Sequence, residues 1–423
     1  AKTSVNCPAR CGRNSGDNCR RLIAVFFRLK KGNTMANTLT NLIPTLYDAM
    51  DVVSREMVGF IPAVSRDSSA ERVALNQTVN IPIVPAISTS NITPGVTAPN
   101  DGDAVIGNTT VTISKSKYGA VRWNGEEQKS LNLNNITARV TRDRFAQAMR
   151  ALVNEIESDL AELHVKCSRA YGTYNAVPFG TAADLSDASQ IRRILEDNGA
   201  PSSDLQMVLG SSAIANIRGK QSVLFKANEA GTSDLLRRGI IGDLEGFQLH
   251  NSAQVKTAVT AGTNNGSATT DTTGYAVGST SIGLASAGTG TIIDGDIITF
   301  ANDFHKYVVK TGDSNVANGG TIVLQEPGLR QALPASAVTI TTVGATTRNM
   351  AFSRSAIVLL TRAPAMPVGG DSAEDVLEIQ DPVSGLAFQV AMYSQYRQIR
   401  YEVGIAWGMQ AVAPRHMALL IGL

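Results

Sequence analysis

The chain contains 423 residues, of which 43% are hydrophobic, 17% are charged and only 5% are aromatic. At roughly 100 to 200 residues per domain, this length predicts two to four domains with enough apolar material for real cores. The composition favours a globular, β-rich protein over a disordered one. No apolar run approaches the roughly 18 residues of a membrane-spanning helix, which excludes a protein that crosses a membrane with such helices.

Charge is distributed unevenly along the chain. The formal net charge is +2, from 38 Lys and Arg against 36 Asp and Glu. Residues 1–34 contain 8 of these bases and a single acid, Asp17, so this segment carries a net +7 and the remainder −5. A mildly acidic body argues against a nucleic-acid-binding surface that extends over the whole protein.

Cysteines follow the same division. Cys7, Cys11 and Cys19 lie in the basic segment, and Cys167 is the only other cysteine. The body therefore has no disulfide framework. The spacing of the first three does not match a zinc finger, and no histidine precedes His164. We expect no metal site in this segment.

The first 34 residues combine basic residues with one short apolar run, without the orderly cleavage site of a signal peptide. We expect native translation to begin at Met35. Codons for Lys30, Lys31 and Gly32 are purine-rich and can spell a bacterial ribosome-binding sequence. The alternative is a disordered basic arm that contacts nucleic acid.

Apolar residues recur at three- and four-residue spacing over residues 38–59, which predicts an amphipathic helix that needs a partner surface. Residues 79–84 alternate as a short strand, and a second strand is predicted over 109–123. The Pro- and Gly-rich stretch 85–107 joins them. Together they predict an extended hairpin that has little core of its own and is marginal in isolation.

The strongest helical pattern runs from Ile136 to Tyr171, without Gly or Pro. Such a helix would be on the order of 50 Å long. His164 and Cys167 lie three residues apart on it, but no further ligand is near, so packing of a helix face is the preferred interpretation. Alternating helices and strands are then predicted at 185–197, 205–209, 211–218 and 244–249, which indicates a mixed α/β region.

The composition changes after Gln254. Of the 35 residues from Thr257 to Thr291, 21 are Gly, Ser or Thr, and Asp271 carries the only charge. Short strands are predicted at 296–300, 306–310, 321–325 and 337–343. This spacing predicts an inserted all-β, barrel-like module. The α/β pattern resumes near Arg348, and long strands that follow are expected to pack beside the long helix.

No catalytic motif is found. The sequence contains no G-x-S-x-G, no phosphate loop and no H-E-x-x-H. Asp294 and Asp296 flank Gly295, a pattern typical of a turn more than of a divalent-ion site. We therefore predict no enzyme, no cofactor and no metal site. A hydrolase whose triad assembles from distant residues would need a nucleophile beside one of the histidines: His164, His250, His305 and His416.

The collinear order of elements resembles the major capsid (coat) protein of tailed double-stranded DNA phages, whose Johnson fold also forms herpesvirus shells and encapsulins. Residues 40–64 (TNLIPTLYDAMDVVSREMVGFIPAV) are similar to the family's N-terminal arm, 79–124 to its extended loop and 136–171 to its spine helix. The most specific segment is 236–252 (LRRGIIGDLEGFQLHNS), which resembles a stretch of the axial domain. Ile405–Met409 followed by Pro414 resembles the closing strands of the peripheral domain.

The resemblance implies an α+β Johnson fold of the podophage coat type, with a long spine helix, an extended hairpin loop, an N-terminal arm and an inserted all-β domain. The expected parts are a basic tail (1–34), the arm (35–78), the hairpin loop (79–131), the spine and start of the peripheral domain (132–180), the axial domain (181–253), the insertion (254–347) and the returning strands (348–423). Maturation by domain rotation and straightening of the spine is also implied.

By the same resemblance, the chain self-assembles into pentamers and hexamers of an icosahedral virion shell. A separate scaffolding protein and a portal are the implied partners, and double-stranded DNA is enclosed without sequence-specific contacts or a membrane. Assembly would occur in the host cytoplasm. The alternatives are an encapsulin-like nanocompartment, disfavoured by the insertion and the long arm, and a secreted β-rich adhesin, which would need an export signal.

Charged residues near the spine start and the hairpin base are the candidate inter-subunit contacts. They are Glu126, Glu127, Arg139, Arg142, Asp143 and Arg144. Solvated helix faces are an equally good interpretation of this pattern. Some members of the family crosslink a hairpin lysine to a neighbouring subunit. Lys115 and Lys117 lie in the second hairpin strand, but the sequence shows no acidic environment for them, and no crosslink is predicted.

Overall fold

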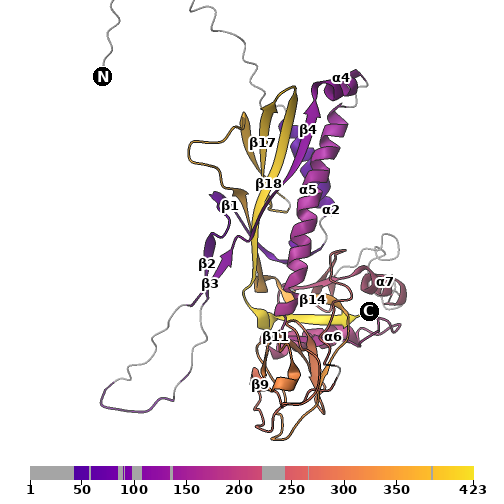
Figure 1. Ribbon diagram of the computed structural model, residues 1–423, viewed down its shortest axis with the longest axis vertical. Coiled ribbons are helices and arrows are strands. Elements are labelled where there is room, and N and C mark those ends of the chain that lie inside the picture. The colour runs from indigo at the N-terminus through magenta and orange to yellow at the C-terminus, as the bar shows by residue number, and fades with distance from the viewer. Residues whose placement is uncertain are drawn as a thin grey trace, which may run out of the picture.

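Two large β-sheets, a separate two-stranded ribbon and one long helix are the main parts of the described fold (Figure 1). The computed structural model describes residues 42–56, 59–83, 89, 91–97, 107–133, 137–221, 243–264, 266–382 and 384–423. The α+β class predicted from the sequence is confirmed. The basic segment and the possible start at Met35 lie outside the described residues, as do residues 236–242 of the segment 236–252.

The long helix α5 spans Thr137–Glu162, which is about 39 Å for 26 residues. The predicted end at Tyr171 is wrong. A 3-10 turn, η2 (Leu163–Lys166), follows the helix, and the chain then extends as β5 (Arg169–Tyr171). This extension allows β5 to pair with one strand on each side and to bury Ala170, and that pairing overrides the helical periodicity.

The first sheet packs against α5 (Figure 1). Its strands are β1 (Ser65–Val73), β4 (Lys115–Asn124), β15 (Ile357–Pro364), β16 (Asp375–Gln380), β17 (Ala387–Gln395) and β18 (Gln398–Ala411). They run in the order β1-β15-β18-β17-β16, with β4 on the other edge of β18. Inward residues of β18 alternate, so that Tyr401 meets Phe145 of α5 edge-on at 5.6 Å and Trp407 is fully buried. The long C-terminal strands therefore pack beside the helix, as predicted.

The N-terminal arm contains α2 (Ile43–Glu56) and the short α3 (Phe60–Ala63). The apolar positions of α2 are buried against α5, which confirms the amphipathic helix inside the predicted range 38–59. Figure 1 shows α2 lying alongside α5. The arm thus covers a helix of its own chain on one side.

The extended loop is rooted in a two-stranded ribbon of β2 (Thr78–Ile83) and β3 (Gly107–Thr112). The single second strand predicted over 109–123 is wrong, because the chain leaves the ribbon after Thr112. From Lys115 it runs as β4 along ten residues of β18 and continues into α4 (Gly125–Leu133). Pairing with β18 buries the alternating apolar residues of β4, which the ribbon alone cannot do.

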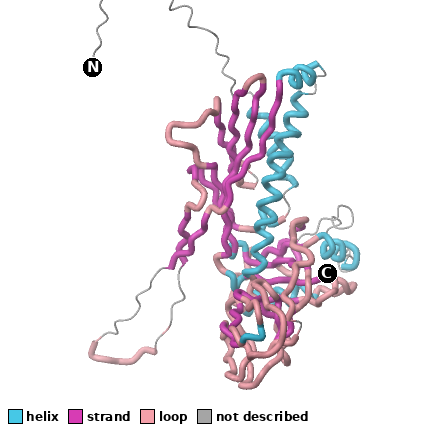
Figure 2. Tube along the Cα trace, in the orientation of Figure 1, coloured by secondary structure: helices cyan, strands magenta, loops and turns pink. Residues whose placement is uncertain are grey.

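The second sheet crosses the lower end of α5 (Figure 2). Besides β5 it includes β6 (Leu205–Leu209), β7 (Asp243–Leu244), β8 (Phe247–Asn251), β14 (Thr347–Ser353) and β19 (Met417–Gly422). Helices α6 (Ser186–Asp197) and α7 (Ser211–Lys220) share an apolar cluster with it. One predicted strand, 244–249, is instead the hairpin β7–β8, because Glu245 and Gly246 both have positive φ and turn the chain.

Residues 254–347 form short strands around an apolar cluster of their own. The strands are β9 (Ser281–Gly283), β10 (Ile297–Phe300), β11 (Lys306–Thr311), β12 (Thr321–Leu324) and β13 (Ile340–Thr342), and the region also contains the 3-10 turn η4 (Val316–Asn318). Two further 3-10 turns, η5 (Arg354–Ala356) and η6 (Pro414–His416), lie outside this region. The four predicted strands are all present. Strand β11 pairs with β5, so the strands of this region are hydrogen-bonded to the second sheet.

Candidate assembly surfaces

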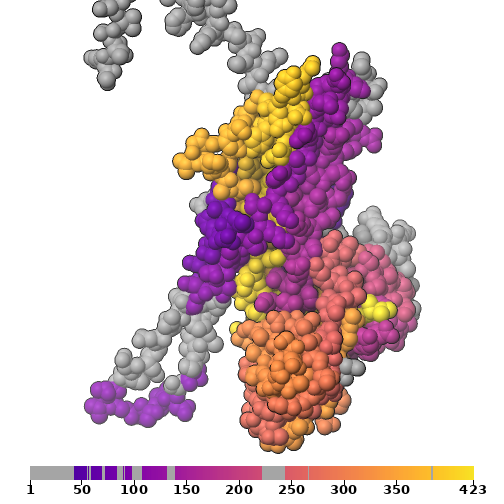
Figure 3. All heavy atoms as spheres, in the orientation of Figure 1, coloured from indigo at the N-terminus to yellow at the C-terminus, as the bar shows by residue number. Residues whose placement is uncertain are grey.

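The tip of the extended loop carries two fully exposed apolar side chains. Ile92 is 99% exposed and Val96 is 107% exposed. The space-filling view shows the tip standing clear of the body (Figure 3). The ribbon beneath it is also largely exposed, apart from Val111, which packs at the root. Two exposed apolar side chains on a projecting loop make this segment a candidate for contact with another molecule.

Glu126 and Glu127 lie in the first turn of α4, at the end of β4 remote from the ribbon. The expectation that they mark the hairpin base is therefore wrong in position. Glu127 forms a capping box with Asn124: Asn124 donates its N–H to Glu127 Oε2 at 3.2 Å, and Glu127 donates its N–H to Asn124 Oδ1 at 2.8 Å. Glu126 is exposed and has no hydrogen bond or ion pair with any residue that the structure describes.

The basic candidates lie on the first turns of α5. Asp143 accepts from Arg142 at 2.9 Å and lies 3.8 Å from Arg139, whose side chain is 80% exposed. Such exposed pairs contribute little to stability and leave their charges accessible.

Arg144 has a local structural role. Its guanidinium carbon lies 4.1 Å from the centre of the Trp123 ring, and an N–H donates to the carbonyl of Arg122 at 3.2 Å. A hollow of about 490 Å³ at this end of the helix is lined by Trp123, Asn124, Glu126, Glu127, Ser130, Val140 and Arg144. The hollow brings Glu126, Glu127 and Arg144 together, whereas Arg139, Arg142 and Asp143 do not line it.

Two lysines of β4, which the sequence placed in the second hairpin strand, bind the spine helix. The sequence did not reveal this role. Lys115 contacts Asp159 at 2.8 Å and Glu155 at 3.3 Å, and Lys117 also pairs with Glu155. The hydrogen bond to Asp159 raises the pKa of Lys115, and the one from Lys117 lowers the pKa of Glu155. Two patterns in the sequence could have indicated these ion pairs. Lys115 and Lys117 are two residues apart on β4, and Glu155 and Asp159 are four residues apart on α5.

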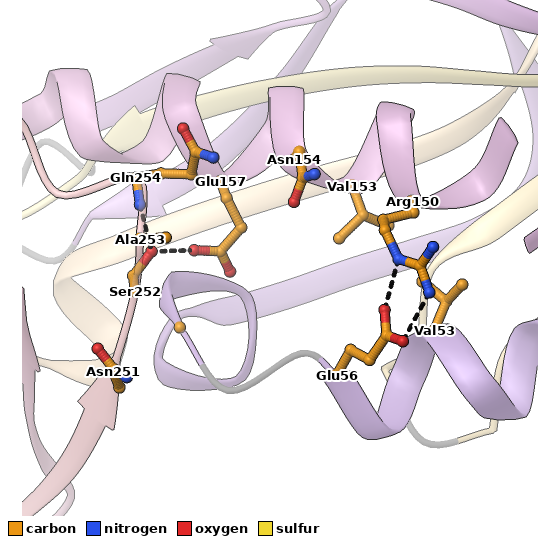
Figure 4. Close-up of a pocket in the computed structure, with 11 residues that line it drawn as sticks. Val53, Glu56, Arg150, Val153, Asn154, Glu157, Asn251, Ser252, Ala253 and Gln254 are labelled. Carbon is orange, nitrogen blue, oxygen red and sulfur yellow. Dashed lines mark hydrogen bonds and ion pairs between the residues drawn. The ribbon is translucent and has the colours of Figure 1, made fainter. Parts of the chain in front are cut away.

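A junction of arm, spine and second sheet surrounds Glu157 (Figure 4). Its carboxylate accepts the N–H of Phe60 and of Ile61, each at 2.8 Å, and the hydroxyl of Ser252 at 3.0 Å. Burial, which dominates over these three hydrogen bonds, raises the pKa of Glu157. The adjoining pocket holds about 250 Å³.

Histidines and acids singled out in the sequence take structural positions. His164 is buried in η2 with Nδ1 3.1 Å from the Ala161 carbonyl, and burial lowers its pKa to about 4. Burial also raises the pKa of the Cys167 thiol. Asp296 accepts backbone N–H groups of Gly262 and Ile293, which is turn chemistry. Among the described residues no cluster suits a metal ion.

The remaining histidines lie apart from one another. His305 contacts Asp303 at 2.6 Å, His250 lies 2.8 Å from the Gln206 side chain, and His416 is in η6.

No helix in the described part of the chain is both long and apolar enough to cross a bilayer.

No family model and no curated protein matches the chain. Solved structures do resemble it. The capsid of cyanophage P-SCSP1u is 9% identical over 85% of this chain and 86% of that one, with a TM-score of 0.46. The capsid of Ralstonia phage GP4 is 9% identical over 85% and 87%, with a TM-score of 0.43. A virus-like particle from Pyrococcus furiosus is 8% identical over 89% and 98%, with a TM-score of 0.41.

The first two of these structures are phage capsids and the third is a virus-like particle. The likeness is distant and concerns the course of the chain. What the chain does is therefore considered below from its own exposed surfaces.

Proposed function

We propose that the chain is a major capsid protein that self-assembles into the icosahedral shell of a tailed double-stranded DNA phage. The exposed apolar loop tip carries this proposal. Ile92 and Val96 have no cover from their own described chain, and the two-stranded ribbon beneath them is marginal in isolation. Burial of both side chains on a neighbouring copy would contribute about 1.5–3 kcal/mol each, repeated at every subunit of the shell.

The composition of the shell, its partners and its location belong to the same proposal. Pentamers and hexamers would form the shell, with a separate scaffolding protein and a portal as partners and DNA enclosed without sequence-specific contacts. The virion would be its location, after assembly in the host cytoplasm. The division into parts, including an insertion over 254–347, is supported by the separate apolar cluster of that region.

Among the charged candidates, exposed Glu126 and Arg139 are the favoured inter-subunit contacts. Glu126 has no described partner, and Arg139 has only a long contact of 3.8 Å to Asp143. Glu127 and Arg144 already serve the fold of their own chain. Opposite charges on adjoining subunits would set register and association rate more than affinity.

Assembly is tested by light scattering and negative-stain microscopy on the full chain, alone and with a co-expressed scaffolding protein from a neighbouring gene. We expect closed shells of uniform diameter. The double variant Ile92→Asp, Val96→Asp should stay unassembled while its circular dichroism matches the parent chain. The matched control Asn91→Asp, Thr93→Asp places the same charges at exposed polar positions of the same segment and should still form shells.

Any of three outcomes would contradict the proposal. A monomer that stays dispersed under every condition would remove the shell function. Normal shells from the Ile92→Asp, Val96→Asp variant would show that the loop tip makes no essential contact. Closed shells that enclose protein cargo and exclude DNA would identify a nanocompartment.

A further inference from the structure

Three segments that are far apart in sequence meet at one carboxylate. Phe60 and Ile61 begin the short helix α3 of the arm, Glu157 lies in the spine helix, and Ser252 follows β8 of the second sheet. Phe60 N–H and Ser252 O–H donate to one oxygen of Glu157, and Ile61 N–H donates to the other. Ser252 Oγ in turn accepts the N–H of Gln254 at 3.2 Å. A single side chain therefore links arm, spine and sheet.

The space around this carboxylate is tightly constrained. Glu157 is only 6% exposed. A Cβ added to Gly59 would lie 2.4 Å from Glu157 Oε2 and 2.9 Å from Ser252 Cβ, so the arm approaches the carboxylate more closely than any other residue type allows. The junction is thus closed on the arm side, and the pocket of about 250 Å³ opens beside it.

Among the residues that the structure describes, no cation forms an ion pair with Glu157. The nearest cation in the pocket, Arg150, donates to Glu56 of α2 through two N–H groups, each at 2.6 Å (Figure 4). Residues 251–254 of the sheet segment and Phe60–Ala63 of α3 are all uncharged. Burial removes water from the charged carboxylate, and hydrogen-bond donors without a counterion offset this cost only in part, so the ionised form is destabilised.

We propose that Glu157 is a proton-linked latch, which holds arm, spine and second sheet together more tightly when it is neutral than when it is ionised. In the open state the carboxylate would be hydrated through the adjoining pocket and would lose its burial. The arm end at Phe60 would then separate from the spine while α2 stays attached through its apolar face. This device is independent of shell formation, because all its parts belong to one chain.

The direction of the pH effect follows from the two states. Burial raises the pKa of Glu157 in the closed latch above the ordinary carboxyl value that it has when open. The closed state therefore binds the proton more tightly. The latch gains stability as pH falls from the raised pKa toward about 4.3 and loses it as pH rises through the raised pKa.

Hydrogen exchange of the full chain, followed by mass spectrometry on the peptide that contains Phe60 and Ile61, tests the latch. Rates are corrected for intrinsic exchange. We expect their protection to be greater at about pH 5 than at about pH 8, by up to about tenfold for each unit of pKa elevation. In Glu157→Gln, which has no titrating group, the corrected protection should not change with pH.

Two further variants make the test specific. Glu56→Gln breaks the neighbouring ion pair in the same pocket and should keep the parental pH dependence. Ser252→Ala removes one hydrogen-bond donor to the ionised carboxylate, so the pH dependence of protection should become steeper. This variant still tests the proposal if Glu157→Gln does not fold. Protection that rises with pH in the parent chain, or an unchanged pH dependence in Glu157→Gln or Ser252→Ala, would overturn the proposal.

Discussion

Trp407 donates its indole N–H to Asp159 Oδ2 at 2.9 Å, and both side chains are almost completely buried, at 0% and 4% exposed. The other carboxylate oxygen accepts from Lys115 at 2.8 Å. One acid of the spine helix thus holds two neighbouring strands of the first sheet, β18 and β4. This contact fixes the sheet on the helix at a defined register, which apolar packing alone would leave adjustable.

Removal of this acid should weaken the whole chain. Asp159→Ala leaves the indole N–H of Trp407 buried without an acceptor, and we expect a loss of about 1–3 kcal/mol in the free energy of unfolding. Urea denaturation followed by tryptophan fluorescence measures it. Glu155→Ala, which removes the more exposed lysine partner, should lose no more than about 1 kcal/mol. Equal losses in the two variants would contradict the role given to Trp407.

Gly59 should not tolerate a side chain. In Gly59→Ala the added methyl would meet Glu157 Oε2 at 2.4 Å, so either the carboxylate or the arm must move. We expect a destabilisation of about 1–3 kcal/mol, as for overpacked cores. Thermal unfolding checks this, with the exposed Gly125→Ala as control, because no atom lies within 4 Å of a Cβ built there. A Gly59→Ala chain as stable as the parent would show that the junction is looser than described.

The guanidinium group of Arg348 is buried, and none of its three nitrogens has a hydrogen-bond partner among the described residues. Arg348 is 1% exposed, and burial lowers its pKa to about 10. Arg348→Met replaces this charge with an apolar side chain of similar length. We expect its unfolding free energy to be equal to that of the parent or higher by about 1–4 kcal/mol, while Arg348→Lys gains nothing. A clear loss in Arg348→Met would mean that the charge is compensated.

His164 should make stability fall on acidification. Its native pKa is lowered to about 4 from 6.5, so the unfolded chain binds the proton first. Stability that is complete above about pH 6.5 is lost progressively as pH falls toward about 4, by about 3 kcal/mol in total. Urea denaturation of the parent and of His164→Gln at several pH values measures the difference. An identical pH dependence in both would exclude His164 as the cause.

Charge reversal can separate assembly from folding at the top of the spine. Glu126→Lys should impair shell formation and leave the unfolding free energy unchanged, because Glu126 has no partner among the described residues. Glu127→Lys removes half of a capping box and should also destabilise the chain by about 0.5–2 kcal/mol. Light scattering and thermal unfolding of both variants distinguish the two effects. Normal shells from Glu126→Lys would remove it from the contact surface.

Local periodicity predicted α2, α5, α6 and α7 and several strands, but not α3 or α4. The spacing of apolar residues located α2, α6 and the body of α5, and the turn residues located β10 to β12. It failed where a partner distant in sequence decides the conformation. The end of α5 at Glu162 and the separation of β3 from β4 both depend on strands more than 130 residues away.

The candidate sites show the same limit. Glu157 and Asp159 look like ordinary polar positions of a helix, because their partners Phe60 and Trp407 are 97 and 248 residues away. The charges at Glu126 and Arg139 could be found from the sequence because exposure needs no partner. Their distinction from Glu127 and Arg144 required the cap and the tryptophan ring, which only the folded chain brings together.

The ribbon beneath the loop tip is continuous at both ends with the first sheet: β1 precedes β2, and β4 follows β3. At its root, Ser114 donates its N–H to the Trp407 carbonyl at 3.1 Å, and Val73 packs with Val111. The ribbon is therefore fixed to the first sheet at its root and projects from it. A small change in the twist of the sheet would move the far end of the ribbon, at Ile83 and Gly107, through a larger distance than its root at Val73 and Val111.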